Sequence, residues 1–312
     1  MRIRSVAAAL ATVATFSACK ASDLNIGNPN AATVAGASAD PLAVQLLATG
    51  LLADMRGNTS SFAQPSGILG RESYTFTPTE GRNTTHYLIG ISVAGQQKLD
   101  PSGFVTFGWA GPYNTMRDVY NFKNTIAANT VLTTAQKAAA LGFAQTIEAY
   151  AALQVLATHD TVGMITEIKA NATELAPFVN RDSAYKYVLG TLNAGYTNLQ
   201  AGGAAFPFTL HAGFTGFNTP ATFGQFNRAL AARAYAYYAT FGGGAAAWQS
   251  ALTALQGSFL NAGATTRAQL DAGVYQVYST STGDATNPLT LATSTTLYAH
   301  QSFQADAQDR KS

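Results

Sequence analysis

The only cysteine of the chain, Cys19, is the residue whose position points most directly to a chemical role. Arg2 and Arg4 give the start of the chain positive charge, residues 6–16 are mainly apolar, and small residues precede the cysteine. The apolar stretch is far shorter than the ~20 residues that a membrane-spanning helix needs. Residues 1–18 are therefore predicted to be a lipoprotein signal peptide, with Cys19 as the lipidated first residue of the mature chain.

Cleavage after Ala18 without lipidation is the alternative, because bacterial lipoprotein signals usually carry leucine where this chain has Phe16. It would leave Cys19 as a free thiol. Residues 19–39 are small and polar and contain Gly, Asn and Pro, so they are predicted to be a tether. A single folded domain, residues 40–312, is expected to follow.

The side chains that could hold a metal or perform catalysis do not form a recognisable motif. The four histidines lie far apart in the sequence: His86, His159, His211 and His300. They form no HExxH pattern and no pair at i, i+4, so no metal site is predicted. No cofactor is predicted either. Each histidine is expected to be a surface residue or a hydrogen-bonded core residue. The chain has no nucleophile elbow and no phosphate-binding loop, and residues 242–244, three glycines, are predicted to be a turn between helices.

Carboxylate pairs are the second kind of catalytic group considered. Glu148 with Glu167, or Glu72 with Glu80, could cleave glycosides only if the fold brought each pair within roughly 5 to 10 Å. Their spacing does not indicate this, so they are expected to be solvated, and no catalytic residue is predicted.

Aromatic side chains offer a different chemistry, because sugars pack C–H faces on exposed rings while polar side chains bind the hydroxyl groups. Rings in irregular segments are the candidates, and they include Phe76 and Tyr298. The predicted ligand-binding set joins such rings to polar neighbours: Arg71, Tyr74, Asn83, His86, Tyr87, Tyr275 and Tyr278. Packing of each ring against the body of the domain is the alternative.

The charge balance argues against electrostatic partners. The chain has 18 Lys and Arg against 16 Asp and Glu, and without Arg2 and Arg4 the two classes would be equal. Only 11% of the residues are charged while 47% are hydrophobic. Capture of nucleic acid or of anionic lipid by charge is therefore not expected.

Apolar periodicity predicts the elements that must position these residues. Asp40 and a following proline are predicted to begin a helix that ends before Gly57, and residues 58–108 are predicted to be irregular, with a short strand at 87–93. Further helices are expected at these positions: 112–129, 134–158 after a capping box, 182–201 capped by Asp182, 220–241, and 245–260.

Ring positions on these helices are expected to be buried. Tyr185, Tyr237 and Trp248 are predicted core residues, with Leu252 beside them, and Trp109 is expected to pack at the start of its helix. Residues 274–278 are predicted to be a short strand. The fold class is thus mainly α, with tetratricopeptide-like helical hairpins, irregular loops and minor β structure, and a generic helical bundle is the alternative.

The order of these features resembles the SusD/RagB group of outer-membrane nutrient-binding lipoproteins. The resemblance covers most of residues 19–260 and rests on helix signatures rather than on a catalytic motif. The quoted segments are Asp23-Leu24-Asn25 with Asn28-Pro29, Trp109 ahead of Tyr113 and Met116, residues 121–129, Glu148-Ala149-Tyr150 with Leu153, residues 181–199, and residues 226–252. In the helix expected at 134–158, the arginine that is usual in the family is missing. Members of the family usually run further, so this chain is expected to be a short divergent member or to be truncated at its C-terminus.

This resemblance implies a helical scaffold, anchored by lipid on the outward face of the outer membrane, that captures oligosaccharide or peptide for a SusC-like TonB-dependent transporter. It implies no enzyme. The alternative is a periplasmic tetratricopeptide lipoprotein that scaffolds envelope assembly, and a third hypothesis is a glycan-cleaving enzyme with two convergent carboxylates.

Overall fold

The computed structural model describes residues 40–77, 79–82, 85–99, 107–171, 173–280, 286–287, 289–290 and 297–305. The predicted signal peptide, Cys19, the tether and Asn83 lie outside the described residues. So do the residues between 23 and 29 that contribute to the family resemblance.

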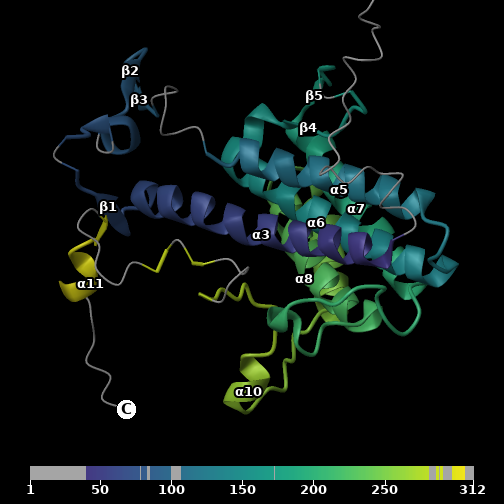
Figure 1. Cartoon of the computed structure of the whole chain (residues 1–312). Helices are drawn as coiled ribbons and strands as arrows, with labels where there is room; N and C mark the ends of the chain where they lie inside the picture. The colour runs from purple at the N-terminus through teal and green to yellow at the C-terminus, as the bar shows by residue number, and fades with distance from the viewer. Residues whose placement is uncertain are drawn as a thin grey trace, which may run out of the picture.

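Helices that are adjacent in the sequence pack against one another in the same order, and Figure 1 shows them gathered in one body. The predicted fold class, mainly α with helical hairpins and minor β structure, is confirmed. The long helices are α3 (Pro41–Leu69), α5 (Ala110–Ala128), α6 (Thr134–His159), α7 (Arg181–Gln200), α8 (Pro220–Tyr238) and α9 (Gly244–Gln256).

Short polar side chains set where these helices begin. Thr133 closes the predicted capping box at the start of α6, and Thr219 closes a second one at the start of α8, where the sequence predicted only that a helix begins. The predicted cap Asp182 is wrong, because the side chain of Asn180 accepts the hydrogen bond from the Ser183 N–H and α7 begins two residues earlier. Asp182 instead lies in the first turn.

Helix α3 runs to Leu69 and therefore passes the predicted stop at Gly57. Tertiary contacts override the local signal: the Asn58 amide donates to the Thr115 hydroxyl of α5 at 2.9 Å, and the Arg56 guanidinium donates to the Val277 carbonyl at 3.0 Å. The predicted irregular region thus begins about three helical turns later. Figure 1 shows the C-terminal half of α3 extending beyond the other helices.

The β structure consists of antiparallel two-stranded sheets of two or three residues a strand. The pairs are β1 (Ser73–Thr75) with β6 (Leu297–Ala299), β2 (Ile91–Val93) with β3 (Gln96–Lys98), and β4 (Met164–Ile165) with β5 (Phe178–Val179). The strand predicted at 87–93 is correct only for Ile91–Val93, because Thr85–Ile89 forms the π-helix η2. Residues 274–278 form no strand.

Aromatic rings from an irregular segment complete the hydrophobic core. Phe206 and Phe208 lie between α7 and α8 in the sequence and pack against Phe143 of α6, with ring centroids 6.1 and 4.9 Å away. Phe223 of α8 lies 5.5 Å from Phe143 and is fully buried. The core is therefore built jointly by the helices and by residues 201–219, which the helical periodicity does not include.

The junction of α8 and α9 differs from the predicted glycine turn. A π-helix, η6 (Ala239–Gly243), continues directly from α8, and Gly244 with φ of +55° starts α9 without an intervening loop. This geometry turns small residues such as Ala247 of α9 inward. Trp248 is 48% exposed and Tyr237 is 40% exposed, so both are wrong as predicted core residues, as is Leu252 at 56%, whereas Tyr185 is buried.

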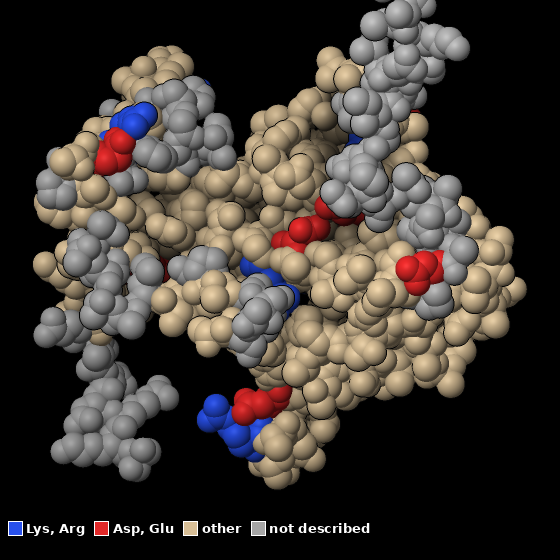
Figure 2. Space-filling model, in the orientation of Figure 1, with Lys and Arg blue, Asp and Glu red and all other residues tan. Residues whose placement is uncertain are grey.

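Charge is sparse on the outside of the molecule. Figure 2 shows a face that is mostly uncharged, with a basic and acidic pair over the short helix α10 (Arg267–Leu270), where Arg267 binds Asp271. No helix within the described ranges is long and apolar enough to cross a membrane.

Helices α6 and α7 cross at glycines. A Cβ added to Gly142 would lie 2.7 Å from the Gly195 carbonyl oxygen and 2.7 Å from the Leu199 Cγ, closer than real contacts allow. Gly195 faces the crossing from α7 and accordingly packs near the Gly142 carbonyl oxygen. The absence of both side chains lets the two backbones approach closely.

Gly142→Ala is expected to lower the free energy of unfolding by about 1–3 kcal/mol, because the added methyl group forces the two helices apart. Gly190→Ala in α7 is the matched control, since nothing lies within 4 Å of its added Cβ, and a gain of up to about 1 kcal/mol is expected there. Urea unfolding of both variants measures the difference. Equal effects would show that the crossing is not tight.

Two carboxyl groups meet where α3 packs on α5. Partial burial, together with the neighbouring Asp118 to which it hydrogen-bonds, raises the pKa of Asp54 to about 6. The folded protein thus holds this proton more tightly than the unfolded chain does. Its contribution to stability is present at low pH and is lost as the pH rises from about 4 through 6.

Acidification from pH 7 to pH 5 is therefore expected to relieve a destabilising charge at Asp54. Asp54→Asn is expected to raise the melting temperature at pH 7 and to reduce the change between the two pH values. Thermal unfolding at both pH values measures this, with Asp271→Asn on the exposed end of α10 as the control. An unchanged pH dependence in Asp54→Asn would contradict the assignment.

Candidate functional site

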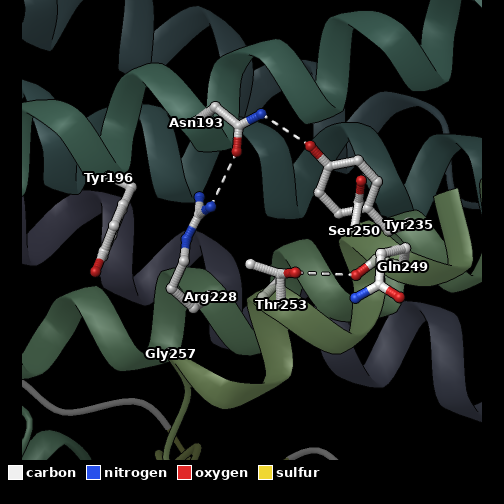
Figure 3. A pocket seen from close by; sticks show the side chains of 9 residues that line it. Asn193, Tyr196, Arg228, Tyr235, Gln249, Ser250, Thr253 and Gly257 are labelled. Carbon is white, nitrogen blue, oxygen red and sulfur yellow. Dashed lines mark hydrogen bonds between the residues drawn. The ribbon is translucent and has the colours of Figure 1, made fainter. Parts of the chain in front are cut away.

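A polar pocket of about 400 Å³ lies among α7, α8 and α9 (Figure 3). Each helix contributes side chains that point toward the same space: Asn193 and Tyr196 from α7, Arg228 and Tyr235 from α8, and Gln249, Ser250 and Thr253 from α9. Cavities of this size hold small organic ligands. All three walls are regular helices, which gives the pocket a rigid frame.

Arg228 lies at the centre of the pocket wall, with only 9% of the residue exposed. Its Nη1 donates to Asn193 Oδ1 at 2.9 Å, its Nη2 donates to the Leu192 carbonyl at 2.8 Å, and its Nε donates to Asn227 Oδ1 at 2.9 Å. The guanidinium carbon lies 4.4 Å from the centre of the Tyr196 ring. The head group is thus held by α7 and α8 together.

The orientation of Arg228 depends on a second layer of hydrogen bonds beneath it. Asn227 Nδ2 donates to the Thr146 hydroxyl of α6 at 2.8 Å, and that hydroxyl donates to the Gly142 carbonyl at 2.8 Å. Thr146 and Asn227 are completely buried. Because Asn227 donates through its nitrogen to Thr146, its oxygen faces Arg228, and the guanidinium is fixed in place.

The pocket carries positive charge and no compensating carboxylate. None of its lining residues is acidic, and Arg228 forms no ion pair with an Asp or Glu that the structure describes. Burial lowers the pKa of Arg228, but an arginine remains charged at any pH at which the protein is folded. The site is therefore a cationic patch surrounded by neutral polar groups.

Helix α9 supplies neutral hydrogen-bonding groups on the other side of the pocket. The hydroxyl of Thr253 donates to the Gln249 carbonyl and the hydroxyl of Ser250 donates to the Ala246 carbonyl, each at 3.0 Å, so both hydroxyl oxygens keep lone pairs for a ligand. The side-chain amide of Gln249 bonds to no described residue. The pocket thus offers both donors and acceptors.

The sequence-based prediction did not include any residue of this pocket. Asn227 and Arg228 lie on a helix that also carries Gln225 and Arg233, so their residue types and spacing gave no signal of a buried site. Tyr235 gave none either, since its spacing is that of the other aromatic residues on the helix. Helix periodicity cannot tell which helix faces a cavity and which faces a neighbour.

Part of the predicted ligand-binding set gathers at the C-terminal end of α3. Tyr74 on β1 and Tyr298 on β6 are paired across the sheet, and their rings stack with centroids 6.0 Å apart. Arg71 lies two residues before β1 and has a φ of +57°. His86 is buried and Tyr87 is partly buried on η2, which packs on α3.

A hollow of about 440 Å³ opens beside this pair of strands. Glu72, Tyr298 and Phe303 line it together with residues from the last turns of α3. Phe303, on the short helix α11 (Ser302–Ala305), is 59% exposed. The hollow is thus open and aromatic, unlike the pocket around Arg228.

Tyr275 and Tyr278 lie elsewhere, so the predicted set does not form one site. The Tyr278 hydroxyl donates to the Arg56 carbonyl at 2.9 Å, and the Tyr275 N–H donates to the Gly213 carbonyl at 3.0 Å. Arg56 lies roughly 20 Å along the helix axis from the end of α3 at Leu69, so Tyr278 lies far from the residues gathered there. These two tyrosines join the C-terminal segment to the helical body.

The histidines and glutamates weighed for catalysis are dispersed. His159 packs on Trp109 with ring centroids 4.8 Å apart, His211 Nδ1 accepts the Gly213 N–H, and the His300 ring bonds to Ser302. No group of three potential metal ligands occurs in the part of the chain that the structure describes.

Glu148 is the exception to the predicted solvation of the glutamates. It is 6% exposed, and its carboxylate accepts from Lys123 at 2.9 Å and from the Tyr187 hydroxyl at 2.7 Å. Burial and this carboxylate both raise the pKa of Tyr187. Glu167 binds Lys169 instead, and Glu80 binds Arg82, so these carboxylates have separate cationic partners.

Comparison with known proteins supports the fold. No protein-family model matches the chain, and no curated protein matches it. Among solved structures, B. fragilis NanU is similar, with a TM-score of 0.51 and 18% identity over 74% of this chain and 44% of NanU. A SusD superfamily protein from Bacteroides vulgatus ATCC 8482 aligns with a TM-score of 0.46 and 16% identity, over 71% of this chain and 43% of that one. The chain thus shares its fold with NanU and spans less than half of the length of either structure.

Proposed function

We propose that this protein is a lipid-anchored binding protein of the outer membrane that captures oligosaccharide or peptide and delivers it to a SusC-like TonB-dependent transporter. The observation that carries the proposal is the polar pocket formed by α7, α8 and α9. The fold shared with NanU and the predicted signal peptide, residues 1–18, directly before Cys19 support it.

The chemistry of the pocket suits binding rather than bond cleavage. Hydroxyl groups of a ligand can bond to the free amide of Gln249 and to the oxygens of Ser250 and Thr253, while the Tyr196 ring offers an apolar face. Glycoside cleavage needs two carboxylates near the bond. None lines this pocket, which favours the binding hypothesis over the glycan-cleaving one.

The predicted residues at the end of α3 are proposed as a second contact for longer ligands. Arg71 and Tyr74 flank Glu72 and Ser73, which line the hollow, and His86 and Tyr87 lie on η2, which packs on α3. Asn83 is proposed as a further ligand contact. Tyr275 and Tyr278 are proposed to support the pocket side of the molecule through the packing of their segment.

Gln249→Ala is expected to weaken binding of a ligand in the pocket by roughly fivefold to tenfold, because about one net hydrogen bond is lost. Gln256→Ala is the matched control, since Gln256 is exposed on the same helix and does not line the pocket. Calorimetric titration with an oligosaccharide mixture and with a peptide digest measures both variants. Equal loss in both variants would place the ligand elsewhere.

The proposed partner and anchor are tested together by purification from detergent-solubilised membranes. A tagged chain with Cys19 intact is expected to recover a TonB-dependent transporter in comparable amount, and the Cys19→Ser variant is expected to leave the membrane fraction. Mass spectrometry of the recovered proteins and protease treatment of intact cells give the readout. Recovery of envelope-assembly proteins without a transporter would contradict the nutrient-capture proposal.

One observation favours the alternative, a periplasmic scaffold. Trp248 and Leu252 are exposed one turn apart on α9, a helix without charged residues, and such a surface suits contact with another protein. The protease treatment of intact cells distinguishes the two functions, because a periplasmic scaffold would be inaccessible to the added protease.

A further inference from the structure

We infer that the ligand of the pocket between α7, α8 and α9 carries a carboxylate group, and that Arg228 binds it. The inference rests on the proposed function and specifies its ligand class. Two sources share this chemistry, the uronic acid residue of an oligosaccharide and the C-terminal carboxylate of a peptide. Arg228 is the only charged residue among those that line the pocket, so the charge of the ligand is inferred from Arg228.

The first support is the lack of an internal counter-ion for a buried cation. Arg228 is nine-tenths buried, and its hydrogen-bond acceptors are two asparagine oxygens and a backbone carbonyl, all of them neutral. By contrast, Lys123, Arg181 and Lys186 bind carboxylates at or near the surface. A buried charge without a partner of opposite sign is costly, so an anionic ligand gains most of its binding energy here.

The second support is the geometry of the remaining donors. Nε and Nη2 of Arg228 are directed at Asn227 and Leu192, and one N–H of Nη1 is directed at Asn193. The other N–H of Nη1 has no acceptor among the described residues. It is the donor that a carboxylate oxygen can reach from the pocket.

A second donor lies next to this position. The Tyr235 hydroxyl accepts from Asn193 Nδ2 at 3.0 Å, so its own proton is left for a ligand. Figure 3 shows Asn193 between Arg228 and Tyr235, bonded to both, at one end of the pocket. A carboxylate can therefore accept from Arg228 and from Tyr235 while the rest of the ligand extends along Gln249 and Thr253 of α9.

The experiment compares charged and neutral probes of matched shape by calorimetric titration of the full mature chain at pH 7. Glucuronate is paired with glucose, and alanyl-alanine with its C-terminal amide. Binding of the charged member of at least one pair is expected to be roughly tenfold tighter or more, because hydrogen bonds to a charged group are the stronger kind. The pair that shows the preference identifies the source of the carboxylate.

Two variants test the role of Arg228. Arg228→Gln is expected to reduce the preference, measured as the ratio of the affinities for the charged and the neutral probe, to about onefold, and circular dichroism checks that it folds. Thr253→Glu adds a negative charge to the pocket without altering the bonds of Arg228, and is expected to reverse the preference. Gln256→Glu is its control outside the pocket and is expected to keep the preference.

The outcomes separate this inference from the proposed function. Equal binding of charged and neutral probes, or a preference that survives both pocket variants, would overturn the carboxylate inference and leave ligand capture intact. Failure of all four probes, of the oligosaccharide mixture and of the peptide digest to bind at millimolar concentration would overturn both.

Discussion

A buried chain of hydrogen bonds connects α6 to α8, reaches α7 through Arg228, and is the interaction on which the pocket depends. It runs from the Gly142 carbonyl through Thr146 to Asn227 and ends at Arg228. Every member has its partner, and removal of any one would leave another buried polar group unpaired, at a cost of about 1–3 kcal/mol. The chain is possible because Gly142 and Gly195 allow α6 and α7 to lie close enough for α8 to reach across both.

The two candidate surfaces differ in how they are supported. The pocket around Arg228 is bounded by helices that bury their other faces in the core, so its side chains have few alternative positions. The hollow at the end of α3 is formed by three-residue strands and by α11, which contact little besides α3. A rigid pocket favours selective binding, whereas a short, exposed sheet suits an adaptable contact with an extended ligand.

The sequence predicted the helices well because their signals are local. The capping box at Thr133, the start at Thr219-Pro220 and the apolar stripe of α7 place helix starts and faces within a few residues. The prediction was wrong where distant contacts decide. Gly57 does not end α3, because Asn58 and Arg56 are held by residues far along the chain.

The pocket could not be predicted for the same reason. Trp248 has the spacing of a core residue, yet alanines of α9 face inward because η6 sets the rotation of that helix. Arg228 looks like any surface arginine in the sequence, and only the crossing of α6 and α7 beneath it makes it a buried cation. Tyr74 was predicted in an irregular region but lies on β1, because its strand and stacking partner Tyr298 lies more than 200 residues away.

The loop-free passage from α8 through η6 into α9 has an evolutionary consequence. Binding proteins commonly change specificity by lengthening or shortening the loops around a site. Here an insertion between α8 and α9 would rotate every residue of α9 and destroy the pocket wall, since Gly244 is the single position at which the backbone changes direction. Divergence of ligand preference is thus confined to point substitutions at a few α9 positions such as Gln249, Ser250 and Thr253, each of which can change without disturbing the core.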